Sequence, residues 1–183
     1  MDIDSAWINV NAETFRMHLA SACLAAGLVL AGTPAFAQTA KLLQKYDDWQ
    51  VFLHETKEEK VCFAASAPKE MEPKAAKRGP VFFYLTTWQK DGVRNEVSVK
   101  VGYTFKADST PLVAVGKDEF QLYPKDDKAF MRDPAEERKL LDAMRKGQTL
   151  TVKGVSQKGT STTDQYSLKG LGSALKQLET ACK

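Results

Sequence analysis

The chain has 183 residues, of which 43% are hydrophobic and 27% charged, and its formal net charge is +3. This length allows one domain with a proper core and is short for two, and the composition excludes a low-complexity chain. The basic residues are dispersed along the sequence, so we expect no nucleic-acid partner.

A short apolar run near the N-terminus is typical of a secretory signal peptide. From Met17 the sequence reads MHLASACLAAGLVLAGTPAFAQTA, and its Ala-Phe-Ala at 35–37 matches the A-x-A cleavage signature. The run is too short for a transmembrane helix, which needs about 20 apolar residues, so we expect no transmembrane segment in the mature chain. We predict cleavage between Ala37 and Gln38, and export to the periplasm or outer envelope.

Residues 1–16 precede this run and carry three acidic residues against one arginine. A signal peptide begins with positive charge, so we expect the true translation start to be Met17. The predicted organisation is an N-terminal extension and cleaved signal peptide over 1–37, followed by a single domain over 38–183. That domain carries 25 Lys and Arg against 20 Asp and Glu, a mild positive charge that suits either an anionic envelope surface or a simply soluble one.

Two cysteines, Cys62 and Cys182, remain once the predicted cleavage removes Cys23. Export places them in an oxidising compartment, where a pair of cysteines most simply forms a disulfide. In the chain-entropy account, closing a loop of about 120 residues stabilises the fold by roughly 4–5 kcal/mol, and the bond would pin the last helix to an early strand. The alternative is two separately buried thiols.

Alternating apolar residues predict antiparallel strands in the first half of the predicted domain. WQVFLHE (49–55) and KVCFAAS (60–66) indicate two strands, VFFYLTTW (81–88) a strand covered on both faces, and Asp91-Gly92 a hairpin turn. The next strand is expected to place the following residues on one face, with Gly102 as a bulge: Val93, Val97, Val99, Val101, Tyr103 and Phe105.

Further strands are expected at 112–116, 119–123 and 128–132, before the hydrophobic period changes to that of a helix. This helix is expected to begin after the N-cap Asp133, with Glu136 reaching back to the cap, and to end at Gly147. The segments 149–157 and 164–170 indicate a final hairpin, and the spacing of Leu171, Leu175 and Leu178 predicts a last helix near 171–181 that faces the sheet. Seven or eight short antiparallel strands with two short helices predict a mainly β fold, a β-sandwich.

The segment APKEMEPKAAKRGP (67–80) lacks apolar periodicity and is typical of a mobile surface loop, which its prolines are expected to keep extended and out of the sheet. It is the most basic stretch of the chain, with Lys69, Lys74, Lys77 and Arg78. Each such charge adds up to about 1 kcal/mol of attraction near an anionic membrane, so this loop is a candidate for peripheral contact with an anionic surface. The alternative is a solvated loop whose lysines only maintain solubility.

His54 is the one histidine of the predicted mature domain, which leaves too few nitrogen and sulfur ligands for zinc, so we expect no metal and no cofactor. A nucleophilic pair of Cys62 with His54 would need a free thiol, which an oxidising compartment removes. The remaining enzymatic alternative is a small periplasmic hydrolase that uses His54 with acids or hydroxyls brought together by the fold.

Three other short motifs have both a functional and a structural interpretation. The stretch GLGS (170–173) lacks the full phosphate-loop fingerprint, so we interpret it as a turn that leads into a helix. The acid pairs at 47–48 and 126–127 are interpreted as turn acids, not as catalytic carboxylates. The hydroxyl-rich run KGTSTTD (158–164) can contact sugar or phosphate, but a hairpin loop has the same composition, and we favour the loop.

The order of these segments resembles the invasion-associated locus B family of exported bacterial proteins. The resemblance covers about residues 41–182 and rests on the stretches WQVFLHE, KVCFAASAPKE, RGPVFFYLTTW, NEVSVKVGYTF, AFMRDPAEERKLLDAMRKGQTLTVKG and TTDQYSLKGLGSAL with its late cysteine. It implies an immunoglobulin-like β-sandwich in the periplasm or outer envelope, with a role in host-cell invasion and virulence for pathogenic members. The family has no catalytic signature, so the resemblance implies no catalytic residues.

Many members of that family have an additional cysteine soon after the first tryptophan, which this sequence lacks. The resemblance therefore implies one disulfide, between Cys62 and Cys182. We expect a non-enzymatic envelope protein, an interaction module whose partner is an envelope component or another protein.

Overall fold

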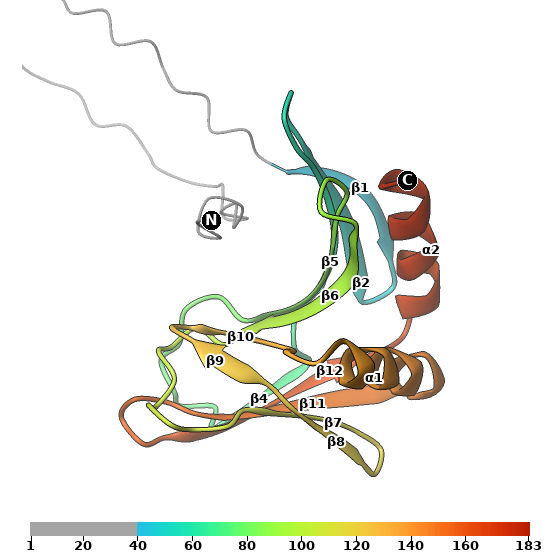
Figure 1. Cartoon of the computed structure of the whole chain (residues 1–183). Helices are drawn as coiled ribbons and strands as arrows, with labels where there is room; N and C mark the ends of the chain where they lie inside the picture. The colour runs from blue at the N-terminus through green and yellow to red at the C-terminus, as the bar shows by residue number, and fades with distance from the viewer. Residues whose placement is uncertain (1–39) are drawn as a thin grey trace, which may run out of the picture. The chain divides into compact units, whose positions relative to one another are not determined.

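Two antiparallel sheets and two helices form the framework of residues 40–183, the part of the chain that the computed structural model describes (Figure 1). The seven-stranded sheet has the order β1 (Lys41–Tyr46), β2 (Trp49–Glu55), β3 (Lys60–Ser66), β5 (Phe82–Trp88), β6 (Val93–Lys100), β10 (Lys128–Phe130) and β9 (Tyr123–Lys125). The five-stranded sheet has the order β4 (Glu70–Glu72), β12 (Ser161–Ser167), β11 (Thr149–Val155), β7 (Leu112–Val115) and β8 (Asp118–Gln121). The predicted mainly β, sandwich-like fold is confirmed. The predicted signal peptide, its cleavage site and the start at Met17 lie outside the described residues.

Large aromatic side chains join the two sheets in the core. Trp49 of β2 is fully buried, and its indole nitrogen donates a hydrogen bond to the Ser167 carbonyl of β12 at 3.1 Å. The ring of Phe83 from β5 lies 6.1 Å from that of Trp49 and 5.8 Å from that of Tyr166 in β12, both edge-on. These contacts fix the five-stranded sheet across one end of the seven-stranded sheet (Figure 1).

Helix α1 (Pro134–Lys146) has the predicted bounds. The Asp133 carboxylate caps it by accepting a hydrogen bond from the Ala135 backbone N–H at 2.7 Å, and Gly147 follows its last turn. Glu136 does not reach back to the cap as expected. Its carboxylate instead pairs with Lys139, one turn further along the exposed side of the helix, at 2.8 Å.

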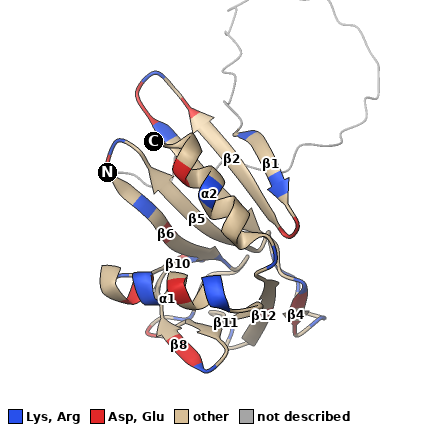
Figure 2. Cartoon of the chain, turned by 90° about the vertical axis from the view of Figure 1, so that its right-hand side faces the viewer, with Lys and Arg blue, Asp and Glu red and all other residues tan. Residues whose placement is uncertain are grey.

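Helix α2 (Leu171–Ala181) lies across the seven-stranded sheet (Figure 2) and buries the leucines of its predicted inner face. The disulfide between Cys62 of β3 and Cys182, just after α2, holds the end of the helix to the sheet with a Cα–Cα distance of 5.9 Å. The predicted disulfide is thus present, and both cysteines are buried. Within residues 40–183 neither helix is long and apolar enough to cross a membrane.

The structure corrects two predictions about strands. The loop at 67–80 is not wholly outside the sheets, because Glu70–Glu72 forms β4 and pairs with β12, where Met71 lies opposite Asp164. Val93 does not share a face with Val97, because the register of β5 and β6 shifts between them and Asn95 takes a positive φ of 56°. The extra residue reverses the alternation, so Val93 is 40% exposed.

Candidate functional site

A buried ion pair anchors the segment at 67–80, which we call the basic loop. The two terminal nitrogens of Arg78 donate hydrogen bonds of 2.6 Å to the two carboxylate oxygens of Asp164, and its Nε donates to the Val101 carbonyl at 3.0 Å. The side chains are 5% and 0% exposed, respectively. The Arg78 charge is therefore paired inside the fold and does not add to the exposed cationic surface of the loop, which corrects its inclusion in the predicted set.

Asp164 and its neighbours stabilise the charged form of Arg78 and hold its side chain in place. Burial lowers the pKa of the Arg78 guanidinium, but the hydrogen bonds and charge of Asp164 outweigh burial, so this pKa is raised above its ordinary value. The Tyr103 ring lies 5.2 Å from the guanidinium carbon, and the Tyr103 hydroxyl shares a hydrogen bond of 2.6 Å with the hydroxyl of Thr162. Three of the five guanidinium N–H groups are used by Asp164 and Val101, so two have no hydrogen bond to the described residues.

A hollow of about 560 Å³ lies against this arginine, and we call it the Arg78 pocket. Three segments far apart in the sequence form it, namely the end of the basic loop, the turn after β6 and the hairpin between β11 and β12. Its lining residues are Pro73, Ala75, Ala76, Lys77, Arg78, Tyr103, Thr104, Ser156, Gln157, Lys158, Thr160 and Thr162. The lining contains three basic residues and no acidic residue.

The hydroxyl-rich run at 158–164 contributes one wall of the Arg78 pocket. It forms the predicted hairpin loop, in which the Ser156 backbone N–H donates to the Thr160 carbonyl at 2.9 Å. Lys158, Thr160 and Thr162 nevertheless line the pocket, so the hairpin and the ligand-contact interpretations of this run are compatible. The sequence does not show that this run lies beside the basic loop, because their proximity depends on the pairing of β4 with β12.

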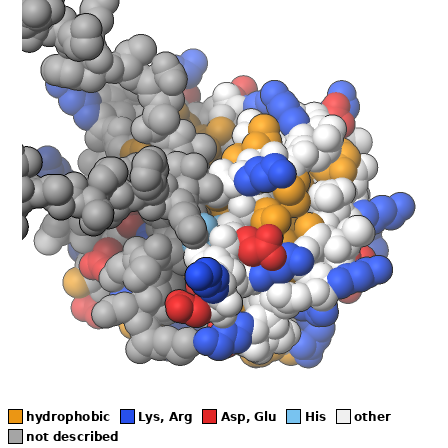
Figure 3. Space-filling view, turned by 90° about the horizontal axis from the view of Figure 1, so that it is seen from above, with side chains coloured by type: hydrophobic (Ala, Val, Ile, Leu, Met, Phe, Trp, Pro, Cys, Tyr) orange, Lys and Arg blue, Asp and Glu red, His pale blue; other side chains and the backbone are white. Residues whose placement is uncertain are grey.

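The remaining lysines of the basic loop differ in their surroundings. Lys69 is paired with Asp48, and this contact lowers the pKa of the Asp48 carboxyl. Lys74 and Lys77 are exposed, and neither forms an ion pair with any described residue. Binding of an anionic surface by these three lysines stays a prediction. On the face seen in Figure 3, Lys and Arg side chains are scattered among acidic and apolar ones.

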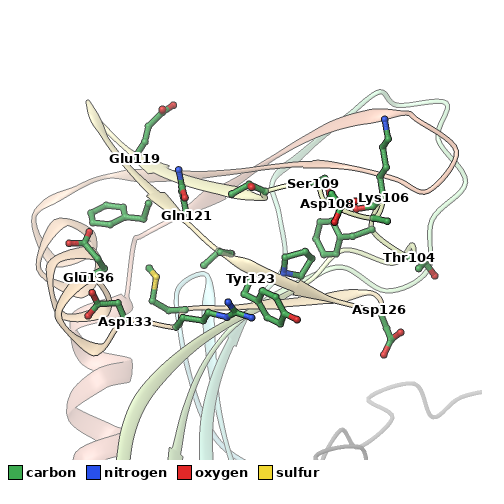
Figure 4. Close-up of a pocket in the computed structure, with 18 of the residues that line it drawn as sticks. Thr104, Lys106, Asp108, Ser109, Glu119, Gln121, Tyr123, Asp126, Asp133 and Glu136 are labelled. Atoms are coloured by element: carbon green, nitrogen blue, oxygen red, sulfur yellow. Dashed lines mark hydrogen bonds between the residues drawn. The ribbon is translucent and has the colours of Figure 1, made fainter.

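A second, larger hollow of about 1120 Å³ has the opposite charge (Figure 4). Its acidic lining residues are Asp108, Glu119, Asp126, Asp133 and Glu136, against the basic Lys106 and Arg132. Arg132 lies over the exposed ring of Tyr123 at 3.5 Å from the ring centroid, so its charge is directed at an aromatic face. The two hollows share Thr104 and Gln157, so hollows of opposite charge lie side by side.

The structure does not bring His54 and Cys62 together. Cys62 pairs with Leu53 across β2 and β3, whereas His54 pairs with Val61. Since successive side chains point to opposite faces, the histidine and the cysteine lie on opposite faces of the sheet, and the cysteine is in the disulfide. Among residues 40–183, His54 forms no hydrogen bond or ion pair with a serine or a carboxylate, and no group of three or more residues could hold a metal ion.

The other short motifs occupy turns. Asp47 and Asp126 have positive φ angles of 49° and 54°, so both acid pairs lie at turns as interpreted. Gly170 has a φ of 89° and immediately precedes α2, in the turn predicted for 170–173. A Cβ at Gly170 would lie 2.1 Å from the Tyr46 carbonyl oxygen, so the turn also requires the close approach that only glycine allows.

The comparisons with known proteins agree with this fold. A model of the "Invasion associated locus B (IalB) protein" family matches residues 49–179. A solved structure, the crystal structure of invasion associated protein B from Bartonella henselae, is similar with a TM-score of 0.53 and 19% sequence identity, over 75% of this chain and 94% of that chain. At this identity the likeness shows a shared fold. A comparison with curated proteins gave no match.

Proposed function

Because this chain belongs to the invasion associated locus B (IalB) family, we propose that it is an exported, non-enzymatic protein of the cell envelope that acts by binding another envelope component. The observation that carries the proposal is the buried Cys62–Cys182 disulfide in a chain of this family. Structural disulfides persist in oxidising compartments such as the periplasm. The names of the family and of the similar Bartonella henselae protein both refer to invasion, and we extend the proposal to a role in host-cell invasion if the source is a pathogen.

A binding role is supported by the placement of the groups that a hydrolase would use. The His54 side chain faces away from Cys62, and Cys62 has no free thiol. The basic loop, in contrast, presents Lys74 and Lys77 to solvent without an acidic partner among the described residues. We propose that Lys69, Lys74 and Lys77 meet an anionic surface of the envelope, with up to about 1 kcal/mol of attraction from each charge close to it.

Export is tested by intact-mass analysis of the protein from a periplasmic extract. We expect a chain that begins at Gln38 and contains one disulfide. Full-length protein found only in the cytosol would contradict the export proposal.

Surface binding is tested by sedimentation with vesicles of phosphatidylcholine containing phosphatidylglycerol. Replacing Lys69, Lys74 and Lys77 with glutamine should abolish binding, and added salt should weaken binding of the wild type. The matched control replaces Lys57, Lys90 and Lys117, three exposed lysines of hairpin turns, with glutamine. Equal losses in both triple variants would show a general charge effect and exclude the loop as the contact.

A further inference from the structure

We propose that the Arg78 pocket binds a phosphorylated sugar. This inference rests on the proposed function in that the sugar would belong to an envelope component. The ligand would bind in a defined pocket, whereas the proposed function concerns export and contact with a charged surface. The residues that carry the inference come from the basic loop, the turn after β6 and the β11–β12 hairpin.

The charge of the pocket fits an anionic group such as phosphate. Lys77 and Lys158 are exposed, and they line the pocket from the loop and the hairpin. The guanidinium of Arg78 lies between these segments and has two N–H groups that no described residue accepts. Guanidinium and ammonium groups together supply the charge-assisted hydrogen bonds that phosphate oxygens accept.

The uncharged part of the lining fits a sugar. Four hydroxyl residues besides Tyr103 line the pocket, namely Thr104, Ser156, Thr160 and Thr162, together with Gln157. The hydroxyls of Ser156 and Thr162 already bond the Thr160 N–H and the Tyr103 hydroxyl, whereas those of Thr104 and Thr160 belong to exposed residues. Hydroxyls and amides can both donate and accept hydrogen bonds, as sugar hydroxyls require. Pro73, Ala75 and Ala76 add the apolar surface on which the C–H faces of a sugar ring can lie. A volume of about 560 Å³ falls within the range of small-molecule sites.

The groups at the base of the pocket are held in place before a ligand arrives. Asp164 and Val101 fix the guanidinium with three hydrogen bonds. The Gln157 backbone N–H donates to the Thr104 carbonyl at 2.8 Å and joins the hairpin to the turn after β6. Little conformational freedom therefore remains to be lost at these positions on binding, which favours affinity from a small contact area.

The test measures binding of glucose 6-phosphate to the purified mature chain by isothermal titration calorimetry or by NMR shifts. We expect saturable binding that is weaker for glucose and for inorganic phosphate, because each of these occupies only one part of the lining. Replacing Lys77 or Lys158 with glutamine should weaken binding about tenfold, the effect of one charge-assisted hydrogen bond. Lys74→Gln is the matched control, since it removes the same charge from the same loop but does not line the pocket, and it should leave affinity unchanged.

Variants at the base of the pocket test whether Tyr103 and Arg78 take part. Tyr103→Phe keeps the ring beside Arg78 and removes the hydroxyl bonded to Thr162, and should weaken binding. Arg78→Met combined with Asp164→Leu removes the ion pair without leaving one charge buried, and should abolish binding in a folded protein. Circular dichroism of each variant separates loss of the pocket from loss of the fold.

A second arm identifies the source of the sugar phosphate. Vesicles of phosphatidylcholine carrying a phosphorylated glucosamine disaccharide lipid are compared with phosphatidylglycerol vesicles of equal charge. Preference for the glycolipid that disappears with Lys158→Gln supports the pocket with a lipid-borne sugar, and binding of glucose 6-phosphate alone supports it with a soluble one. No saturable binding of either ligand, or equal effects of Lys74→Gln and Lys77→Gln, would overturn the proposal. These results do not depend on export, which the periplasmic extract tests. Lys158 lies outside the basic loop, so Lys158→Gln separates the pocket from surface contact by the loop, whose lysine triple variant includes Lys77 of the pocket.

Discussion

Replacing Asp164 with asparagine is expected to lower the free energy of unfolding by about 3–5 kcal/mol. Asparagine has nearly the shape of aspartate and keeps one oxygen acceptor, so the change is mainly one of charge. The Arg78 side chain is 5% exposed, and its counterion is fully buried. Without the carboxylate, the guanidinium charge stays largely buried with no anionic partner, which is the costly case for a buried ion pair. A loss of this size is a large fraction of the typical 5–15 kcal/mol stability of a domain.

Urea unfolding followed by tryptophan fluorescence, to which the fully buried Trp49 contributes, measures this loss. The disulfide is kept intact in all variants, so the unfolded chains are comparable and the denaturant slope should not change. The matched control is Glu119→Gln, which breaks the exposed ion pair of Glu119 with Lys153 at 3.4 Å. We expect that control to change stability by less than about 0.5 kcal/mol, because exposed ion pairs contribute little.

The double variant Arg78→Met, Asp164→Leu completes the test. It removes both charges together and should cost less than Asp164→Asn alone, because no unpaired charge remains. The explanation is refuted if Asp164→Asn lowers stability by less than about 1 kcal/mol. It is also refuted if the double variant loses as much stability as the single variants Arg78→Met and Asp164→Leu lose in sum.

Three further predictions use the same unfolding measurement. Changing both Cys62 and Cys182 to alanine should lower the free energy of unfolding by about 2–5 kcal/mol, and reduction of the wild type should have the same effect. Without the disulfide, which closes a loop of 120 residues, the unfolded chain gains conformational entropy. A loss below about 1 kcal/mol would be inconsistent with this role of the disulfide. Burial raises the pKa of Glu137, and the hydrogen bond from the Val97 N–H offsets this effect in part. The folded protein therefore binds this proton more tightly than the unfolded chain does, and stability is lost as pH rises from the ordinary carboxyl pKa through the raised one. Glu137→Gln keeps an acceptor for Val97 and should be more stable than wild type at neutral pH, with an advantage that disappears in acid; an advantage independent of pH would argue against this origin. Gly170→Ala should be strongly destabilising, because the added Cβ would clash with the Tyr46 carbonyl. At Gly172 an added Cβ would have no atom within 4 Å, so Gly172→Ala should stabilise α2 by about 0.4–1 kcal/mol. Equal effects at the two glycines would contradict this account.

The elements that sequence analysis predicted well are those whose signals are local. The cap at Asp133 and the stop at Gly147 gave the bounds of α1 because a helix end must satisfy its own backbone groups within a few residues. Alternation located β2, β3 and β5 because each has a buried face. The strands β1, β4 and β9 were missed because none of their residues is buried, so no buried face marks them in the sequence.

The Arg78 pocket could be predicted only in fragments. Both the basic loop and the hydroxyl-rich run are visible in the sequence, but Arg78 was predicted to be a surface cation. Arg78 and Asp164 are 86 residues apart, and composition does not distinguish a buried arginine from an exposed one. The pairing depends on β4, whose contacts with β12 are made by the backbone and leave no pattern in the side chains.

The outer strands of the two sheets carry charges of opposite sign, which limits how copies of this domain can associate. The edges of the seven-stranded sheet, β1 and β9, contain Lys41, Lys45 and Lys125 and no acidic residue. The edges of the five-stranded sheet, β4 and β8, contain Glu70, Glu72, Asp118 and Glu119 and no basic residue. Open edges are templates for aggregation, and like charges oppose the joining of one edge to its own copy. A symmetric dimer through continuous sheets is therefore disfavoured at every edge, and Pro124 in β9 further weakens that edge by removing a backbone donor.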